Sequence, residues 1–195
     1  MFRLAPSSDP TPSIRADGLL LRYPRMEDYE EWAQLRQESR SFLAPWEPIW
    51  PLDDLTRQSY RRRMKRYHDD VIADLAYTLF IFEPTTGSLM GGLTLGNVRR
   101  GVSQSATLGY WMGQPFAGRG IMTKAVRLAK MYAFDKLGLR RIEAGCIPSN
   151  TPSIRVLEAN GFDREGYAKE YLCIAGVWQD HYLYACLNKA GSKQV

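Results

Sequence analysis

The sequence predicts a single domain of mixed α/β class, in which a seven-stranded sheet is flanked by helices. Segments with strand and helix patterns follow one another in the order β-α-α-β-β-β-α-β-α-β-β, without an internal repeat. The 195 residues, 45% hydrophobic and 24% charged, suffice for one substantial core. We expect the domain at residues 17–188, after a loose proline- and serine-rich arm at 1–16 and before a tail at 189–195.

At the centre of this pattern, a strand, a glycine loop and a helix follow one another directly. Residues 106–112 are mostly apolar, Gly118 and Gly120 lie in the loop, and apolar residues then recur at helical spacing from Met122 to Ala133. The first amides of a helix lack acceptors within it, and glycine lets a phosphate approach the backbone. The loop, with Arg119 inside it, is either an anion site or a plain connection.

The segments before this centre begin with a strand at 19–23 and a helix at 28–40, and a second helix is expected at 54–67. Between the helices, Pro45, Pro48 and Pro51 exclude a continuous helix. Trp46 and Trp50 in this segment either cap the core or line a groove for a peptide substrate. Two strands at 77–82 and 89–95 follow, joined by a Pro-Thr-Thr-Gly turn.

The segments after the centre complete the sheet. A strand is expected at 141–147, and Thr151 and Pro152 then supply the cap and first turn of a helix that ends at Gly161. Two final strands at 167–172 and 177–187 flank Ala175 and Gly176.

Composition excludes several classes of protein. Three scattered cysteines do not make a disulfide framework, and two separated histidines do not make a zinc site. No apolar run reaches the length of a membrane span, and residues 1–16 lack the apolar segment of a signal peptide. We therefore expect a cytoplasmic protein without a metal and without membrane association.

The net charge of +5 indicates anionic partners. The densest positive run is Arg61-Arg62-Arg63-Met64-Lys65-Arg66. It is either the solvated face of a helix or a contact with coenzyme phosphates, an acidic substrate or RNA. No motif for sequence-specific nucleic-acid binding accompanies it.

A Walker loop is not present, because the string Gly-x-x-x-x-Gly-Lys-Ser/Thr does not occur. The dinucleotide fingerprint is not present either, because Thr123 stands where its third glycine would be. Ala117-Gly118-Arg119-Gly120-Ile121-Met122 instead resembles the pyrophosphate loop of the GNAT acetyltransferases, Gln/Arg-x-x-Gly-x-Gly/Ala, although Ala117 and Met122 depart from it. The motifs Asn150-Thr151-Pro152-Ser153, Asn160-Gly161-Phe162 and Glu165-Gly166-Tyr167 resemble the Rim-type branch, which acetylates N-terminal amines of ribosomal proteins. The segments 42–48, 166–172 and 176–181 resemble its RimJ-type subfamily, and the similarity spans about residues 19–187.

This resemblance implies a GNAT fold, mainly antiparallel, with a splayed parallel pair of strands at its centre, formed here by 106–112 and 141–147. Acetyl-CoA would be the co-substrate, with its pantetheine arm between these strands. A main-chain amide near Tyr110, Trp111 or Met112 would polarise the acetyl carbonyl, and such a donor contributes about 3 kcal/mol. The loop residues that would hold the pyrophosphate are Ala117, Gly118, Arg119, Gly120, Ile121, Met122 and Thr123.

The resemblance also implies roles for three side chains. Asn150 would bind the pantetheine arm, Ser153 would contact the coenzyme and act as general acid, and Glu170 would act as general base. Each also has a structural interpretation: a helix cap, a first-turn residue and a strand-surface charge. The tyrosine acid that many GNAT enzymes carry four residues after Ser153 is replaced by Leu157. Cys146 either forms a mixed disulfide with CoA or is a small buried residue.

The predicted function is transfer of an acetyl group to the N-terminal α-amine of a protein, with a ribosomal-protein alanine as the favoured acceptor. An α-amine has a pKa near 8, against about 10.4 for lysine, so one carboxylate base is enough to deprotonate it. Trp46, Glu47 and Glu170 are the expected acceptor-binding residues. The alternatives are an acetyltransferase of a small amine, such as a polyamine or antibiotic, and a basic RNA- or ribosome-associated binding protein with a vestigial CoA site.

Overall fold

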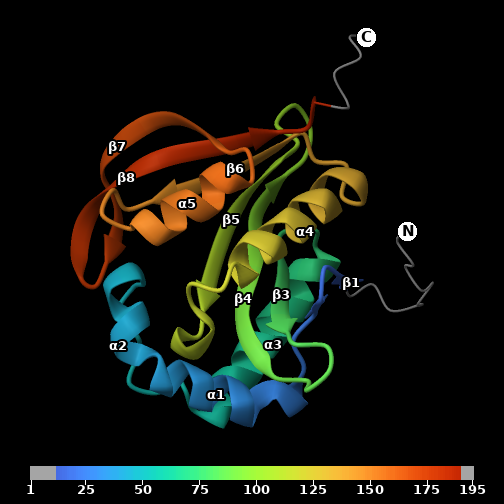
Figure 1. Cartoon of the computed structure of the whole chain (residues 1–195), viewed down its shortest axis with the longest axis vertical. Coiled ribbons are helices and arrows are strands. Elements are labelled where there is room, and N and C mark those ends of the chain that lie inside the picture. The colour runs from blue at the N-terminus through green and yellow to red at the C-terminus, as the bar shows by residue number, and fades with distance from the viewer. Residues whose placement is uncertain (1–11, 190–195) are drawn as a thin grey trace.

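The strands of the computed structural model, which describes residues 12–189, form one sheet with helices on both faces (Figure 1). The strands are β1 (Ser13–Ala16), β2 (Leu19–Arg22), β3 (Tyr77–Phe82), β4 (Leu89–Arg99), β5 (Ser105–Met112), β6 (Arg141–Cys146), β7 (Asp163–Ile174) and β8 (Val177–Leu187). The α-helices are α1 (Tyr29–Glu38), α2 (Arg40–Leu43), α3 (Arg57–Ile72), α4 (Ile121–Asp135) and α5 (Thr151–Ala159). Short 3-10 helices lie at η1 (Met26–Asp28), η2 (Ala44–Trp46) and η3 (Gln114–Phe116).

The sheet has the strand order β1-β2-β3-β4-β5-β6-β8-β7 and is antiparallel except at its centre, where β5 and β6 are parallel. This parallel register covers only three pairs, Ser105↔Arg141, Ala106↔Ile142 and Thr107↔Glu143. The strands then separate, and β5 continues to Met112 while β6 continues to Cys146. The prediction of a splayed parallel pair at the centre of the sheet is therefore confirmed.

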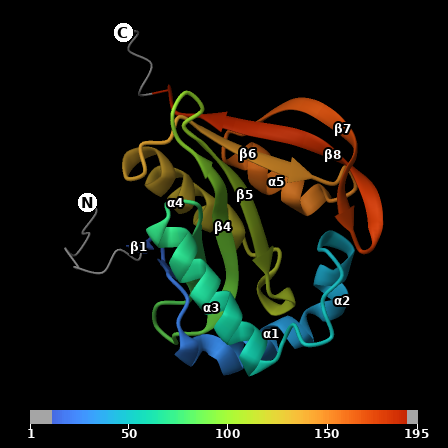
Figure 2. The ribbon, with the colours of Figure 1, turned by 180° about the vertical axis from the view of Figure 1, so that it is seen from behind.

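Helices α4 and α5 cover one face of the sheet, and α1 and α3 cover the other (Figures 1 and 2). Side chains alternate between the two faces along a strand, so Leu79 and Ile81 of β3 belong to a different buried cluster from Phe80. The first cluster includes Ala125 and Ala129 of α4, and the second includes Trp32 and Tyr60. Both faces of the sheet are thus buried at its centre.

The sheet has one strand more than the seven predicted, because Ser13–Ala16 form β1 and pair with β2. The prediction of a loose arm is wrong for these four residues. Asp17 and Gly18, with φ angles of 56° and 74°, form the tight turn between the two strands. An Asp-Gly pair between apolar residues is a hairpin signal, and it was the overlooked evidence for this strand. The rest of the predicted arm, residues 1–11, and most of the predicted tail, 190–195, lie outside the described residues.

Two helix starts also differ from the prediction. Helix α3 begins three residues later than expected and extends to Ile72, with Thr56 as its cap, whose hydroxyl accepts a hydrogen bond from the Ser59 amide. The cap of α5 is Asn150 rather than Thr151, since its side-chain oxygen accepts a hydrogen bond from the Ser153 amide over 3.1 Å.

Asn160, at the end of α5, ties this helix to α4. Its buried amide group donates hydrogen bonds to the carbonyls of Thr123 (3.1 Å) and Val156 (2.8 Å), and its own carbonyl accepts one from Lys130 (2.6 Å). We predict that Asn160→Ala lowers the free energy of unfolding by about 2 kcal/mol, because the carbonyls of Thr123 and Val156 lose their bonds from the buried Asn160 amide. Urea denaturation measures this change, and a loss under about 0.5 kcal/mol would contradict the assigned role.

Candidate active site

The opening between β5 and β6 is the first feature of the site. Along a strand with an antiparallel neighbour on one side, alternate peptide groups point to the other side. Beyond Thr107, that other side of β5 faces no strand partner within residues 12–189, because β6 has already diverged. Main-chain groups of the segment from Gly109 to Met112 are therefore available to a ligand inserted between the strands.

The glycine loop lies directly after β5 and η3. Gly118 and Gly120 adopt left-handed φ angles of 72° and 71°, and a side chain added to either would meet no atom within 4 Å. Gly120 is the N-cap of α4, so the first turn of that helix has no side-chain cap. The loop is exposed, and Arg119 adds a positive charge to it. These features fit a bound phosphate group.

A tyrosine from β5 and a serine from α5 meet across the opening. The Tyr110 hydroxyl lies 2.8 Å from the Ser153 Oγ and donates to, or accepts from, that hydroxyl. Burial raises the pKa of the Tyr110 phenol above its ordinary value, and the hydrogen bond with Ser153 opposes this shift only in part. Tyr110 therefore stays protonated at neutral pH and is available as a proton donor through Ser153.

Leu157, at the position where many GNAT enzymes carry a tyrosine, is fully buried in the core. From the sequence, Tyr110 is expected only as a main-chain contact. The missed signal was alternation along the strand, which places Tyr110 on the same face as Leu108 and Met112, toward α4 and α5.

Cys146 and Asn150 lie beside this pair. Burial raises the pKa of the Cys146 thiol, and its Sγ lies 3.6 Å from the Ile147 carbonyl oxygen. These features agree with a small buried residue rather than a reactive thiolate. The Asn150 side-chain oxygen caps α5, while its Nδ2 has no hydrogen-bond partner among the residues that the structure describes. Asn150 can therefore cap α5 through its Oδ1 and donate a hydrogen bond to a ligand through its Nδ2 at the same time.

On the opposite face of the sheet, Glu47 is held by buried Arg36 of α1. The guanidinium donates to both carboxylate oxygens over 2.8 and 2.7 Å, and the Trp50 Nε1 donates to one of them over 2.7 Å. Arg36 lies over the rings of Trp50 and Trp111, at 4.1 and 5.0 Å from their centroids. Because the Glu47 charge is paired with Arg36, Glu47 fixes the loop rather than presenting a free carboxylate. Trp46 is half-buried at the end of η2.

The hairpin of β7 and β8 reaches the same loop, since the Ala175 amide donates to the Glu47 carbonyl over 2.9 Å. Within β7, Glu170 lies in a bulge with φ of 44°, and its amide donates to Asp180 over 2.8 Å. The Glu170 side chain is exposed. Tyr171 and buried His181 lie beside Gly145 of β6, within 3.5 Å of where its Cβ would stand. His181 was not singled out from the sequence as a site residue.

The imidazole of His181 has a defined hydrogen-bond arrangement. Its Nδ1 lies 2.9 Å from the Gln179 carbonyl oxygen. A carbonyl only accepts, so Nδ1 carries a proton and the Nε2 of the neutral ring retains its lone pair. His181 is therefore a second candidate base beside Glu170.

The basic run lies on α3, outside this site. Arg61, Arg62, Lys65 and Arg66 are exposed, and Arg62 and Arg63 form ion pairs with Asp53 and Asp54. The run therefore lies on an exposed face of α3.

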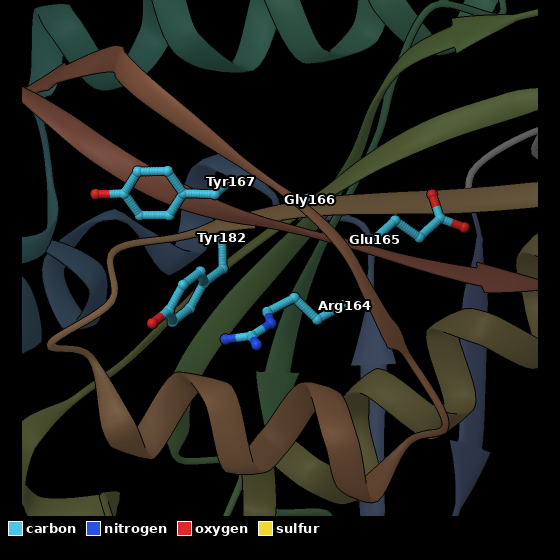
Figure 3. Close-up of a pocket in the computed structure, with 5 residues that line it drawn as sticks. All are labelled: Arg164, Glu165, Gly166, Tyr167 and Tyr182. Carbon is cyan, nitrogen blue, oxygen red and sulfur yellow. The ribbon is translucent and has the colours of Figure 1, made fainter.

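A shallow surface hollow of about 530 Å³ lies on the outer side of the β7–β8 hairpin, near α5 (Figure 3). Arg164 and Tyr182 point toward each other there, with the guanidinium 4.5 Å from the ring centroid. Tyr167, also at the hollow, donates a hydrogen bond to Asp180. The hollow contains none of the predicted site residues.

Between residues 12 and 189, no helix has the length and apolar character needed to cross a membrane. The same part of the chain contains no group of three or more His, Cys, Asp or Glu side chains that could hold a metal ion.

The splayed strands and the uncapped start of α4 fit the acetyltransferase class, and the comparisons with known proteins show the same class. Residues 18–163 match the family model described as "Acetyltransferase (GNAT) domain", and the chain belongs to this family. It is 38% identical over 175 residues to "Probable N-acetyltransferase YjcK" of Bacillus subtilis (strain 168), covering 90% of this chain and 97% of that relative. It is 32% identical over 179 residues to the "[Ribosomal protein uS5]-alanine N-acetyltransferase" of Escherichia coli (strain K12), covering 92% of each.

The fold has close structural neighbours. Mycobacterium smegmatis RimJ in complex with CoA-disulfide superposes with a TM-score of 0.85 at 32% identity, covering 94% of this chain and 90% of that one. The predictions of a GNAT fold and of N-acetyltransferase activity are thus confirmed.

We predict that Tyr110→Phe lowers kcat for acetyl transfer by about 10²-fold, because general acid assistance typically contributes that much. The phenylalanine ring preserves the packing of β5 against α5. Tyr132→Phe is the matched control, since burial also raises the pKa of Tyr132 on α4. Steady-state assays of CoA thiol release compare the two variants. Equal kcat values would contradict a role for Tyr110 in proton transfer.

Proposed function

We propose that this acetyltransferase transfers the acetyl group of acetyl-CoA to the N-terminal α-amine of a protein, with an N-terminal alanine of a ribosomal protein as the favoured acceptor. The observation that carries the proposal is the similarity to the Escherichia coli uS5-alanine enzyme, which covers 92% of both chains. An acceptor of this kind implies action in the cytoplasm, at or near the ribosome.

The residues of the coenzyme side fit acetyl-CoA. The amides of residues 118–123 would hold its pyrophosphate, because Gly120 leaves the start of α4 uncapped. The opening between β5 and β6 would take the pantetheine arm, with a hydrogen bond from Asn150 Nδ2. Acetyl-CoA supplies an activated thioester carbonyl and a thiolate leaving group. An amide in the segment from Tyr110 to Met112 would donate to that carbonyl oxygen.

The residues on either side of the opening would move two protons. Glu170 on the β7 bulge would accept a proton from the incoming ammonium, with His181 as the other candidate. Ser153, hydrogen-bonded to Tyr110 over 2.8 Å, would donate a proton to the leaving sulfur. An ordinary thiol has a pKa near 8.5, so this donor can be a weak acid.

The acceptor side would receive the amine through the Pro- and Trp-containing loop and the β7–β8 hairpin. Because Arg36 neutralises Glu47, we assign Glu47 and Trp46 to shaping this entrance. The Arg36 side chain is a positioning residue for the loop, since it contacts Glu47, Trp50 and Trp111.

A panel of acceptors tests the proposed function. We expect CoA thiol release with alanine- and serine-initiated peptides, and none with an N-terminally blocked lysine peptide, a polyamine or an aminoglycoside. Mass spectrometry of the peptide product locates the acetyl group on the α-amine. Release with the small amines alone would reject the protein acceptor and retain the acetyltransferase, whereas RNA binding without thiol release would support a binding protein.

The base is tested with Glu170→Gln. We predict that this variant loses about 10²-fold in kcat/KM at pH 7 and that the deficit narrows toward pH 9, because an α-amine with a pKa near 8 then loses its proton to water. His181→Gln is measured in parallel. If Glu170→Gln keeps the wild-type kcat/KM while His181→Gln loses it, then His181 rather than Glu170 is the base.

A further inference from the structure

Helix α3 presents most of its basic residues to solvent on one side. We define the basic face by five exposed side chains of this helix: Arg57, Arg61, Arg62, Lys65 and Arg66. The opposite side of the helix is buried through Tyr60, Met64 and Val71, so the core fixes the orientation of the face. Arg63 is not part of the face, because it is half-buried and donates a hydrogen bond to Asp54.

The charge of the basic face is only partly neutralised by neighbouring carboxylates. Arg57 and Arg62 each form an ion pair with a carboxylate from a segment that precedes the helix, and both partners of each pair are more than half exposed. Exposed pairs of this kind are weak, so both arginines can exchange their partner for another anion. Arg61, Lys65 and Arg66 form no ion pair with any of residues 12–189.

The spacing of these charges is unfavourable for the helix itself. Arg61 lies four residues before Lys65, and Arg62 lies four residues before Arg66. Like charges at this spacing are neighbours on the helix surface and repel each other. Within α3, acidic residues occur only in the last turn, at positions 69–70. An external anion therefore accounts for the arrangement better than the stability of the helix does.

The composition of the basic face indicates which kind of anion it fits. The centre of a protein–protein interface is rich in aromatic side chains and depleted in lysine, whereas the centre of this face contains only arginine and lysine. A membrane-bound helix inserts its apolar side, and the apolar side of α3 is buried in the core. The phosphate backbone of a nucleic acid is contacted mainly by arginine and lysine, without an apolar centre.

The coenzyme site proposed above does not use this face. Helix α3 covers the face of the sheet opposite to α4, whose first turn follows the glycine loop (Figure 2). The pyrophosphate of acetyl-CoA at that loop would therefore lie on the other side of the sheet from α3. The basic face needs an anion of its own.

We infer that the basic face of α3 binds the phosphate backbone of RNA without reading its sequence. From Arg57 to Arg66 the face extends about 14 Å along the helix axis. Successive phosphates on one strand of a duplex are spaced by roughly 3.4 Å along its axis, so about four of them fall within this length. The choice of RNA rests on the proposed function, since RNA accompanies a ribosomal acceptor. The contact itself is measured without acetyl transfer.

A fluorescein-labelled RNA duplex of about 20 base pairs tests the inference by fluorescence anisotropy at several salt concentrations. The wild-type protein is compared with the triple variant Arg61→Gln/Lys65→Gln/Arg66→Gln. We expect the variant to bind at least about tenfold more weakly at low salt. The slope of log affinity against log salt concentration should fall in magnitude by about two to three, because each lost phosphate contact removes about one unit. Its kcat/KM for a free N-terminal peptide should remain that of the wild type.

The matched control is Arg99→Gln/Lys136→Gln/Arg155→Gln. It removes the same charge from exposed side chains that are scattered over β4, the end of α4 and α5. We expect this control to keep the wild-type affinity and salt slope. Both triple variants should keep the wild-type Tm, because the substituted side chains are exposed and the α3 variant loses only repulsive neighbours. An equal loss of RNA binding in the control would assign the binding to net charge and overturn the inference.

Two other results would also overturn the inference. One is a wild-type protein that does not bind the RNA duplex at low salt. The other is binding of a poly-glutamate peptide that is as tight as RNA binding and equally sensitive to the α3 variant, which would make the face a docking surface for an acidic protein. Peptide acetylation without RNA binding would reject the RNA contact and leave the proposed function intact. RNA binding that depends on α3, with small amines as the only acceptors, would support the contact and reject the proposed function.

Discussion

The site depends on how short the parallel pairing between β5 and β6 is. Strands β5 and β6 pair at only three positions and then diverge, which leaves main-chain groups of the half-buried end of β5 without a strand partner in the described chain. Unpaired peptide groups cost free energy unless a ligand or water satisfies them. The flanking antiparallel strands, β4 on one side and β8 on the other, hold the two strands apart. We propose that acetyl-CoA and the acceptor amine meet at this opening.

A second constraint is the cluster of contacts around Glu47, on the side where we propose that the acceptor binds. Its carboxylate accepts three hydrogen bonds, from Arg36 and Trp50, and its carbonyl accepts one from the β7–β8 hairpin. Removing one partner of such a mostly buried ion pair typically costs about 3 kcal/mol, because the other charge is left unpaired. Glu47, a candidate substrate-binding carboxylate in the sequence, thus fixes the Pro- and Trp-containing loop against the β7–β8 hairpin.

The sequence predicted most of the fold because strong local signals matched tertiary packing. The turn signals beside them located β3 and β8 to the residue, and glycines 118 and 120 located the loop before α4. The ion pair of Glu47 with Arg36 could not be predicted, since α1 and the loop meet only in three dimensions. The same holds for the Tyr110–Ser153 contact and for the approach of Ile49 to Gly176. Each depends on the distance between segments far apart in the chain, which residue spacing does not contain.

Hydrogen–deuterium exchange of the full chain, with and without saturating CoA, tests the central claim most directly. If the opening between β5 and β6 receives the coenzyme, amides in residues 109–112 and in the loop at 118–123 become protected together on CoA binding. Amides of β1 and β2, at the far edge of the sheet, keep their rates. CoA binding that protects the loop but leaves residues 109–112 unchanged would contradict the account, because the coenzyme would then bind without entering the opening.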